Sequence, residues 1–86
     1  MPVYLMPKVD EIMATDSSDI EKLAQAFSYL VEQHINMILR EQELQKAVGE
    51  DTALVKLQIQ AGTMEYVFGM FRDCYQRATG KKVPHG

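Results

Sequence analysis

The sequence predicts an all-α fold built on one long antiparallel helical hairpin. In two stretches of about 30 residues each, apolar side chains recur every three or four positions, the period that gives an α-helix one apolar face. A short segment, Gly49-Glu50-Asp51, separates the two stretches, and Gly80 follows the second. Because a chain of 86 residues has room for only a thin core, we also expect two hairpins to pair into a four-helix bundle.

An N-terminal arm, residues 1–17, comes before the hairpin. Pro7 suits the first position of a helix because it lacks a backbone N–H, and this leaves open either a short helix over residues 7–14 or an extended segment. Apolar side chains are expected to anchor the arm, either on its own hairpin or on a partner subunit. These anchors are Val3, Leu5, Val9, Ile12 and Met13.

The first long helix is predicted over residues 19–48. Ser18-Asp19-Ile20-Glu21 has the form of a capping box, in which the serine hydroxyl accepts a hydrogen bond from a backbone N–H and the glutamate reaches back to the cap. Gly49 is expected to end the helix, because glycine adopts the left-handed C-cap conformation without a Cβ clash. The apolar row consists of Ile20, Leu23, Ala24, Phe27, Leu30, Val31, Ile35 and Ile38, with His34 as its one polar member.

The second long helix is predicted over residues 52–79, with Asp51 as its N-cap and Gly80 as its end. Its main apolar row alternates spacings of three and four, which is typical of coiled-coil packing. Because the connection is only about three residues long, the two helices must lie side by side and antiparallel. The row consists of Leu54, Leu57, Ala61, Met64, Phe68, Phe71, Tyr75 and Ala78.

A second apolar row gives this helix a wider apolar arc than one neighbouring helix covers. We therefore expect something else to pack there. The sequence leaves open three coverings: the N-terminal arm folding back, a second copy of the chain, or a different protein. The second row consists of Val55, Ile59, Val67, Met70 and Cys74.

Aromatic and sulfur-containing side chains are concentrated in the last third of the hairpin. Their helical spacing is typical of core residues, but their number exceeds what a two-helix core is expected to bury. We therefore predict a partner-binding surface, at which these side chains bury apolar area against another protein. The predicted partner-binding residues are Met64, Phe68, Met70, Phe71 and Tyr75.

Four further residues within the predicted helices stand out. Gly62 and Gly69 lie on one side of the second helix. Each glycine destabilises a helix interior by up to about 1 kcal/mol relative to alanine. The pair therefore indicates either close packing of another element at these positions or two tolerated glycines without a role. His34 has no ligand partner three residues before it, so we predict a buried or interfacial histidine bonded to a neighbour, and not a metal ligand. Cys74 has no neighbouring histidine to activate it and is predicted to be a packing residue.

The charge of the chain argues against a protein held on nucleic acid mainly by phosphate contacts, because the net charge is −3. Residues 1–43 hold eight acids and three bases, whereas residues 44–86 hold four acids and six bases. Such asymmetry can orient self-assembly or steer a partner, although an uneven solvated surface is also open. The basic residues at the end of the hairpin continue into residues 81–86, which we predict to be a frayed basic tail.

No catalytic residue, cofactor or metal is predicted. The single cysteine rules out an intrachain disulfide, and with only two histidines the chain lacks the ligands of a Cys/His zinc site. No glycine-rich phosphate loop or nucleophile elbow is present. No apolar run is long enough to cross a membrane, and the first residues lack the form of a signal peptide, so we expect a cytoplasmic protein.

These observations favour a non-enzymatic protein–protein interaction module, a homodimer that acts as an adaptor, chaperone or inhibitor through an apolar face of the second helix. Two alternatives stay open. One is a structural subunit or accessory protein of a larger helical assembly, in which the acidic half and the basic end meet head to tail. The other is a small nucleic-acid-associated regulator that uses the basic tail.

Overall fold

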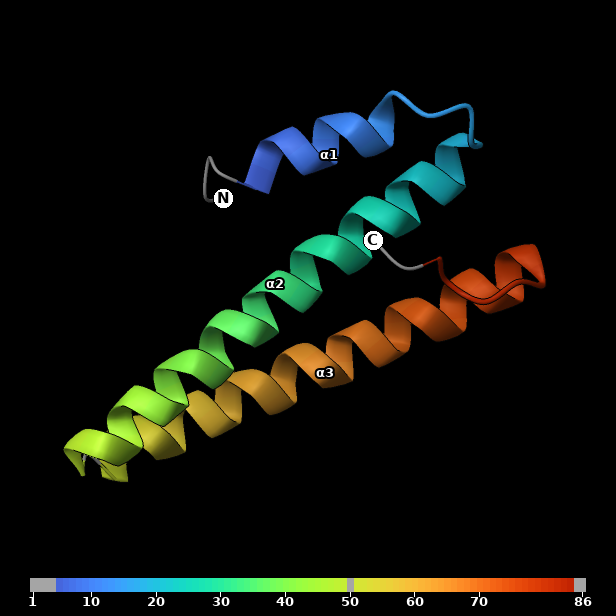
Figure 1. The fold of residues 1–86 in the computed structure, drawn as a ribbon. Coiled ribbons are helices and arrows are strands. Elements are labelled where there is room, and N and C mark those ends of the chain that lie inside the picture. The colour runs from blue at the N-terminus through green and yellow to red at the C-terminus, as the bar shows by residue number, and fades with distance from the viewer. Residues whose placement is uncertain (1–4, 50, 85–86) are drawn as a thin grey trace.

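The computed structural model describes residues 5–49 and 51–84. Over these residues it contains three α-helices: α1 (Met6–Met13), α2 (Asp19–Val48) and α3 (Asp51–Thr79). Helices α2 and α3 pack against each other along an antiparallel hairpin, and α1 packs on α2 of the same chain (Figure 1). The prediction of an all-α helical hairpin is therefore confirmed.

The three helices lie side by side in one layer, with α2 in the middle (Figure 1). The Cα trace measures 47 × 28 × 15 Å and has a radius of gyration of 15.3 Å, whereas a compact domain of this length has a radius of about 12 Å. Because α1 and α3 lie on either side of α2, no helix of the described chain crosses a broad side of this layer (Figure 1).

Local signals set the ends of α2, as the sequence predicts. The Ser18 hydroxyl accepts a hydrogen bond from the backbone N–H of Glu21 at 3.3 Å. Gly49 takes the left-handed conformation, with φ of 82°, and its N–H donates to the Gln45 carbonyl at 2.9 Å. The other half of the predicted capping box differs, because the Glu21 carboxylate lies next to Lys81. Helix α3 begins at Asp51 itself, one residue before the predicted start, and Glu50 lies outside the described residues.

Replacing Gly49 with alanine is expected to lower the free energy of unfolding by about 1 kcal/mol, because a Cβ is strained at positive φ. No described atom lies within 4 Å of the place that this Cβ would take, so the backbone conformation alone causes the loss. The matched control is Gly62→Ala inside α3, which should raise the free energy of unfolding by about 0.5 to 1 kcal/mol. Urea denaturation measures both changes. Equal effects of the two substitutions would contradict this account of Gly49.

The N-terminal arm folds back on its own hairpin. Leu5 and Ile12 are each 2% exposed, and Val9 between them is half-buried, so one side of α1 faces the molecule. Met13 is 43% exposed and contributes less to this contact. Of the two arrangements that the sequence left open, packing on its own hairpin and exchange with a partner subunit, the structure has the first. The further anchor Val3 lies outside the described residues.

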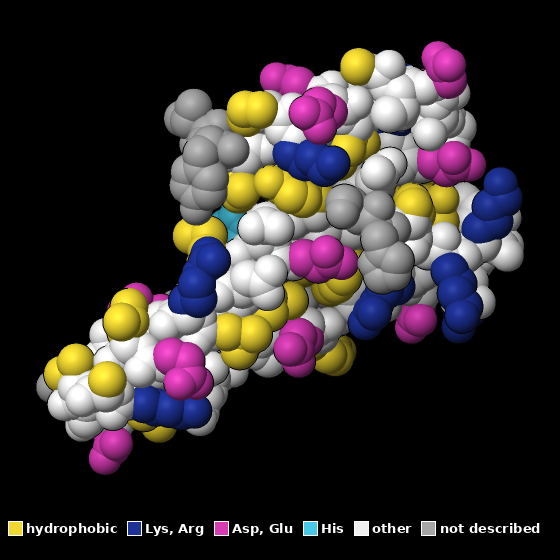
Figure 2. Space-filling model, viewed as in Figure 1, with side chains coloured by type: hydrophobic (Ala, Val, Ile, Leu, Met, Phe, Trp, Pro, Cys, Tyr) yellow, Lys and Arg dark blue, Asp and Glu magenta, His cyan; other side chains and the backbone are white. Residues whose placement is uncertain are grey.

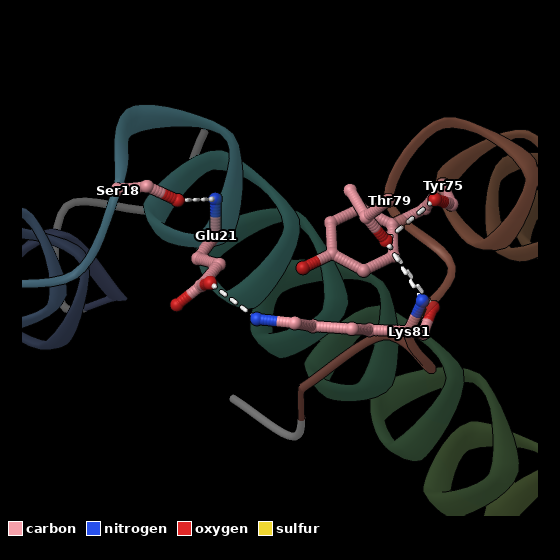
Figure 3. A network of polar contacts seen from close by, with 5 residues as sticks. All are labelled: Ser18, Glu21, Tyr75, Thr79 and Lys81. Carbon is pink, nitrogen blue, oxygen red and sulfur yellow. Dashed lines mark hydrogen bonds and ion pairs between the residues drawn. The ribbon is translucent and has the colours of Figure 1, made fainter.

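The C-terminal tail differs from the predicted frayed end over its described residues, 81–84. Gly80 adopts φ of 71° and reverses the chain direction after α3. The Thr79 hydroxyl donates to the Tyr75 carbonyl at 2.9 Å and accepts from the Lys81 N–H at 3.1 Å. Lys81 Nζ then lies 3.6 Å from Glu21 Oε1 on α2 (Figure 3).

Beyond this turn the tail covers part of the hairpin. Val83 and Pro84 are half-buried and line a shallow hollow together with Glu32 of α2 and Arg72 of α3. A glycine reversal and a threonine cap thus place apolar tail residues against the hairpin, an arrangement that a basic composition alone does not reveal. Residues 85–86 of the predicted tail lie outside the described residues.

Candidate protein-binding surfaces

An aromatic cluster joins α2 to α3 near the open end of the hairpin. The Phe27 ring of α2 stacks on Phe71 with a centroid distance of 4.4 Å and lies 6.2 Å from Phe68. Tyr75 extends the cluster, with its ring 6.5 Å from that of Phe71. The Arg72 guanidinium lies 4.9 Å from the Phe68 ring centroid, which is cation–π geometry. Stacked rings at these distances stabilise the contact between the two helices beyond simple area burial.

The structure divides the five predicted partner-binding residues into two groups. Phe68, Phe71 and Met64 are half-buried on the α2 side of α3, and Tyr75 is only 5% exposed. Tyr75 is therefore mostly covered within the single chain, and its predicted place on a partner-binding surface stays a prediction. Met70 is 48% exposed, because at 100° per residue it points away from the row that meets α2.

Two apolar hollows lie between α2 and α3. At 100° per residue their lining residues share one side of each helix, and we call this side of the hairpin the open face. The larger hollow has a volume of about 320 Å³ and the smaller of about 210 Å³. None of the described residues that line them is Lys, Arg, Asp or Glu. The open face consists of Ile20, Leu23, Phe27, Leu30, Val31 and His34 on α2, with Thr63, Met64, Val67, Phe71, Cys74, Tyr75 and Ala78 on α3.

His34 is the polar member of the open face. Its Nδ1–H donates to the Leu30 carbonyl one turn earlier at 2.9 Å, which makes Nε2 the acceptor nitrogen of the neutral ring. The side chain is half-buried and lines the larger hollow. The structure thus gives the histidine a backbone partner within its own helix, and its predicted role at an interface stays a prediction.

A second apolar surface follows the side of α3 that points away from α2, and we call it the outer row. It consists of Val55, Ile59, Tyr66 and Met70, whose spacings of four, seven and four place them on one side of the helix. Their exposed fractions are 52%, 64%, 70% and 48% in that order. Three of them belong to the second apolar row predicted from the sequence. Tyr66 was missed there, although its distance of seven residues from Ile59 indicates the same side of the helix.

Gly62 and Gly69 are not closely approached within the described chain. Apart from their chain neighbours and the nearby backbone of α3 itself, no described heavy atom lies within 4 Å of the place that a Cβ would take on either residue. Within the described chain α2 meets a different side of α3, so close packing of another element at these glycines stays a prediction. Space for a side chain exists at both positions, which is consistent with the other interpretation, a tolerated pair without a role.

The remaining candidate chemistry is sparse in the described residues. Cys74 is a free, exposed cysteine, and over residues 5–49 and 51–84 no group of three or more metal-ligating side chains is found. Within the same ranges, none of the helices is both long and apolar enough to cross a membrane. Comparison with protein-family models, curated proteins and solved structures found no match. The open face and the outer row are therefore the two surfaces of the described chain that we consider for binding.

Proposed function

We propose that this chain is a non-enzymatic protein–protein interaction module that binds another protein through the outer row of α3. The observation that carries the proposal is the exposure of four large apolar side chains, between 48% and 70%, along one side of a single helix. A helix side with this pattern in water exposes apolar area that a partner removes. The proposed action is occupancy, as in an adaptor, chaperone or inhibitor.

The shape of the outer row favours an amphipathic helix as the partner's contact element. Val55 and Met70 are about 22 Å apart along α3, at 1.5 Å per residue, so four anchors extend over about four helical turns. A helix from the partner can bury side chains at the same spacing. Tyr66 is the expected anchor, because tyrosine combines a large apolar ring with a hydroxyl and is enriched at interface centres.

Charged side chains beside the outer row supply a polar rim. Glu65 and Asp73 are exposed on α3 next to Tyr66 and Met70. Arg77 lies one turn after Asp73, so both signs occur along the same side of the helix. Rim charges of this kind orient a partner and raise the rate of association more than they raise affinity.

Tyr66→Ser is expected to abolish capture of the partner when tagged chain is incubated with extract of the cells that make it. Loss of one central aromatic anchor typically weakens binding by about 2 kcal/mol or more, which is about 30-fold. The matched control is Glu65→Ser, the neighbouring exposed position, which should retain the partner. Circular dichroism should show the same helical content for both variants, because Tyr66 is 70% exposed.

The readout is one protein retained in constant ratio to the bait and absent from the Tyr66→Ser sample. Equal retention by Tyr66→Ser and the wild type would remove the outer row as the binding surface. Loss with both variants would contradict the role assigned to the tyrosine ring and would indicate a contact made mainly by charge.

The two other functions suggested by the sequence both rely on the basic end of the chain. In the structure Lys81 lies beside Glu21 of the same chain, and Arg72 lies over the Phe68 ring, so both cations have partners inside the molecule. Figure 2 shows acidic and basic side chains on the same visible side, a mixture that attracts phosphate backbones poorly. The outer row is therefore the better supported basis for function.

The proposed compartment is the cytoplasm. The chain has a single cysteine, and in the structure it is free and exposed. Exposed free thiols persist most readily where glutathione and thioredoxin keep them reduced.

A further inference from the structure

We propose that a second copy of this chain docks on the open face, so that the two hairpins form a four-helix bundle. In this dimer α2 and α3 of each copy contribute to one shared core, and each α1 stays on its own α2. Both outer rows point away from the bundle. The proposal goes beyond binding of another protein at the outer row, because it concerns a different surface and a different partner.

The first argument is the amount of exposed surface. The chain exposes 6032 Å², whereas a compact monomer of 9.8 kDa exposes about 5,200 Å². The excess is about 850 Å², close to the 800 Å² or so that each partner buries in an interface of standard size. Docking of one copy on one broad side of the molecule would therefore bury about this excess area.

The second argument decides which broad side receives the copy. At 100° per residue Glu32 and Arg72 lie on the other side of α2 and α3 from the open face. The tail residues Val83 and Pro84 line the same hollow as these two charged residues. Within the described chain, the open face has no such cover. On it Leu23 is 58% exposed and Val67 is 44% exposed. Stacking this side on a second layer gives the two-layer arrangement in which helices normally bury their apolar stripes.

The third argument is self-complementarity. In a two-fold contact each copy presents the same surface, so any charge at its centre would meet an identical charge nearby. The two hollows of the open face have no Lys, Arg, Asp or Glu among the described residues that line them. Exposed side chains such as Leu23 can enter the hollows of the other copy, in the manner of knobs into holes. A chain with a net charge of −3 thus associates with itself where it carries no charge.

Light scattering over a wide concentration range tests the proposal. The wild type should change from about 10 kDa to about 20 kDa as concentration rises, while its helical content stays high. Leu23→Glu should raise the dimer dissociation constant by about 100-fold or more, because two copies each bury an unpaired carboxylate. The matched control is Ile59→Glu on the outer row, a residue that is 64% exposed and should leave the dimer intact.

Cys74 provides a second measurement that needs no substitution. It lines the smaller hollow beside Leu23 and Phe71 and is exposed in the single chain. Its reaction with a thiol reagent should slow by about tenfold or more at concentrations at which the mass has doubled. In the Leu23→Glu variant the reaction should stay fast at the same concentrations.

Three results would overturn the proposal: a wild-type mass of one chain at all concentrations, a dimer that Ile59→Glu but not Leu23→Glu dissociates, or a dimer in which Cys74 reacts as fast as in the monomer. The outcome is separable from that of the proposed function. Leu23→Glu should not affect capture of a partner through Tyr66, and Tyr66→Ser should not affect the mass of the dimer.

Discussion

Replacing Phe27 with alanine is expected to lower the free energy of unfolding by about 3 kcal/mol. The Phe27 ring stacks on Phe71 at 4.4 Å and also lies 6.2 Å from Phe68, so it connects α2 to both phenylalanines of α3. Its removal leaves a cavity between the helices and breaks two aromatic contacts at once. A small domain has few kcal/mol to lose, so a large fraction of the variant should be unfolded at about 37 °C.

Thermal and urea denaturation followed by circular dichroism measure this loss. The matched control is Leu44→Ala on the same helix, which should change the free energy of unfolding by less than about 0.5 kcal/mol, because Leu44 is 61% exposed. Phe27 also lines the open face, so denaturation should be repeated at several protein concentrations. A loss confined to high concentration would contradict a core role and would assign Phe27 to the dimer contact alone.

Placing an aspartate at Ile12 is expected to release α1 from α2. Ile12 is 2% exposed, and burying an unpaired carboxylate there would cost several kcal/mol. The contact of an eight-residue helix with α2 supplies too little packing to offset that cost. Because isolated helices shorter than about 12 residues are marginal in water, the released segment should also lose its helical structure.

Hydrogen exchange read by mass spectrometry detects this change directly. Amides of residues 6–14 should lose their protection, whereas amides of α2 beyond residue 36 should keep theirs. The matched control is Met13→Asp, at the neighbouring position that is 43% exposed, where α1 should stay docked. Retained protection in Ile12→Asp would contradict the packing of α1 on α2.

The same variant tests the exchange of the arm between subunits that the sequence left open. If α1 packs in cis, as the structure shows, Ile12→Asp should leave the mass of the assembly unchanged at concentrations at which the wild type is dimeric. A shift to monomer on release of α1 would indicate that the arm contacts the partner subunit. Light scattering distinguishes the two arrangements.

The secondary structure could be read from the sequence because its signals are local. Ser18 satisfies a free N–H at the start of α2, and Gly49 and Gly80 take positive φ at the two helix ends. Each of these effects depends on atoms within about four residues along the chain. The predicted helix over residues 19–48 therefore has the bounds of α2, and that over 52–79 differs from α3 by one residue.

The candidate surfaces could be predicted only in part. Periodicity gives the angular position of each side chain around its own helix, but not the direction from which a neighbour approaches. The sequence therefore placed Tyr75 and Met70 on one partner-binding surface, whereas Tyr75 is buried in the hairpin and Met70 is exposed. The seven-residue spacing from Ile59 indicates the side of α3 on which Tyr66 lies, but it does not show whether anything covers the tyrosine.

The sequence by itself determined an all-α hairpin with its two long helices and the glycines that end them. The tertiary structure alone decided that α1 docks beside α2, that the tail returns over one broad side, and that the open face and the outer row stay uncovered within the described chain. The physical reason is the range of the interactions involved. Capping and backbone hydrogen bonds act within one or two turns, whereas burial depends on every segment that competes for the same apolar surface.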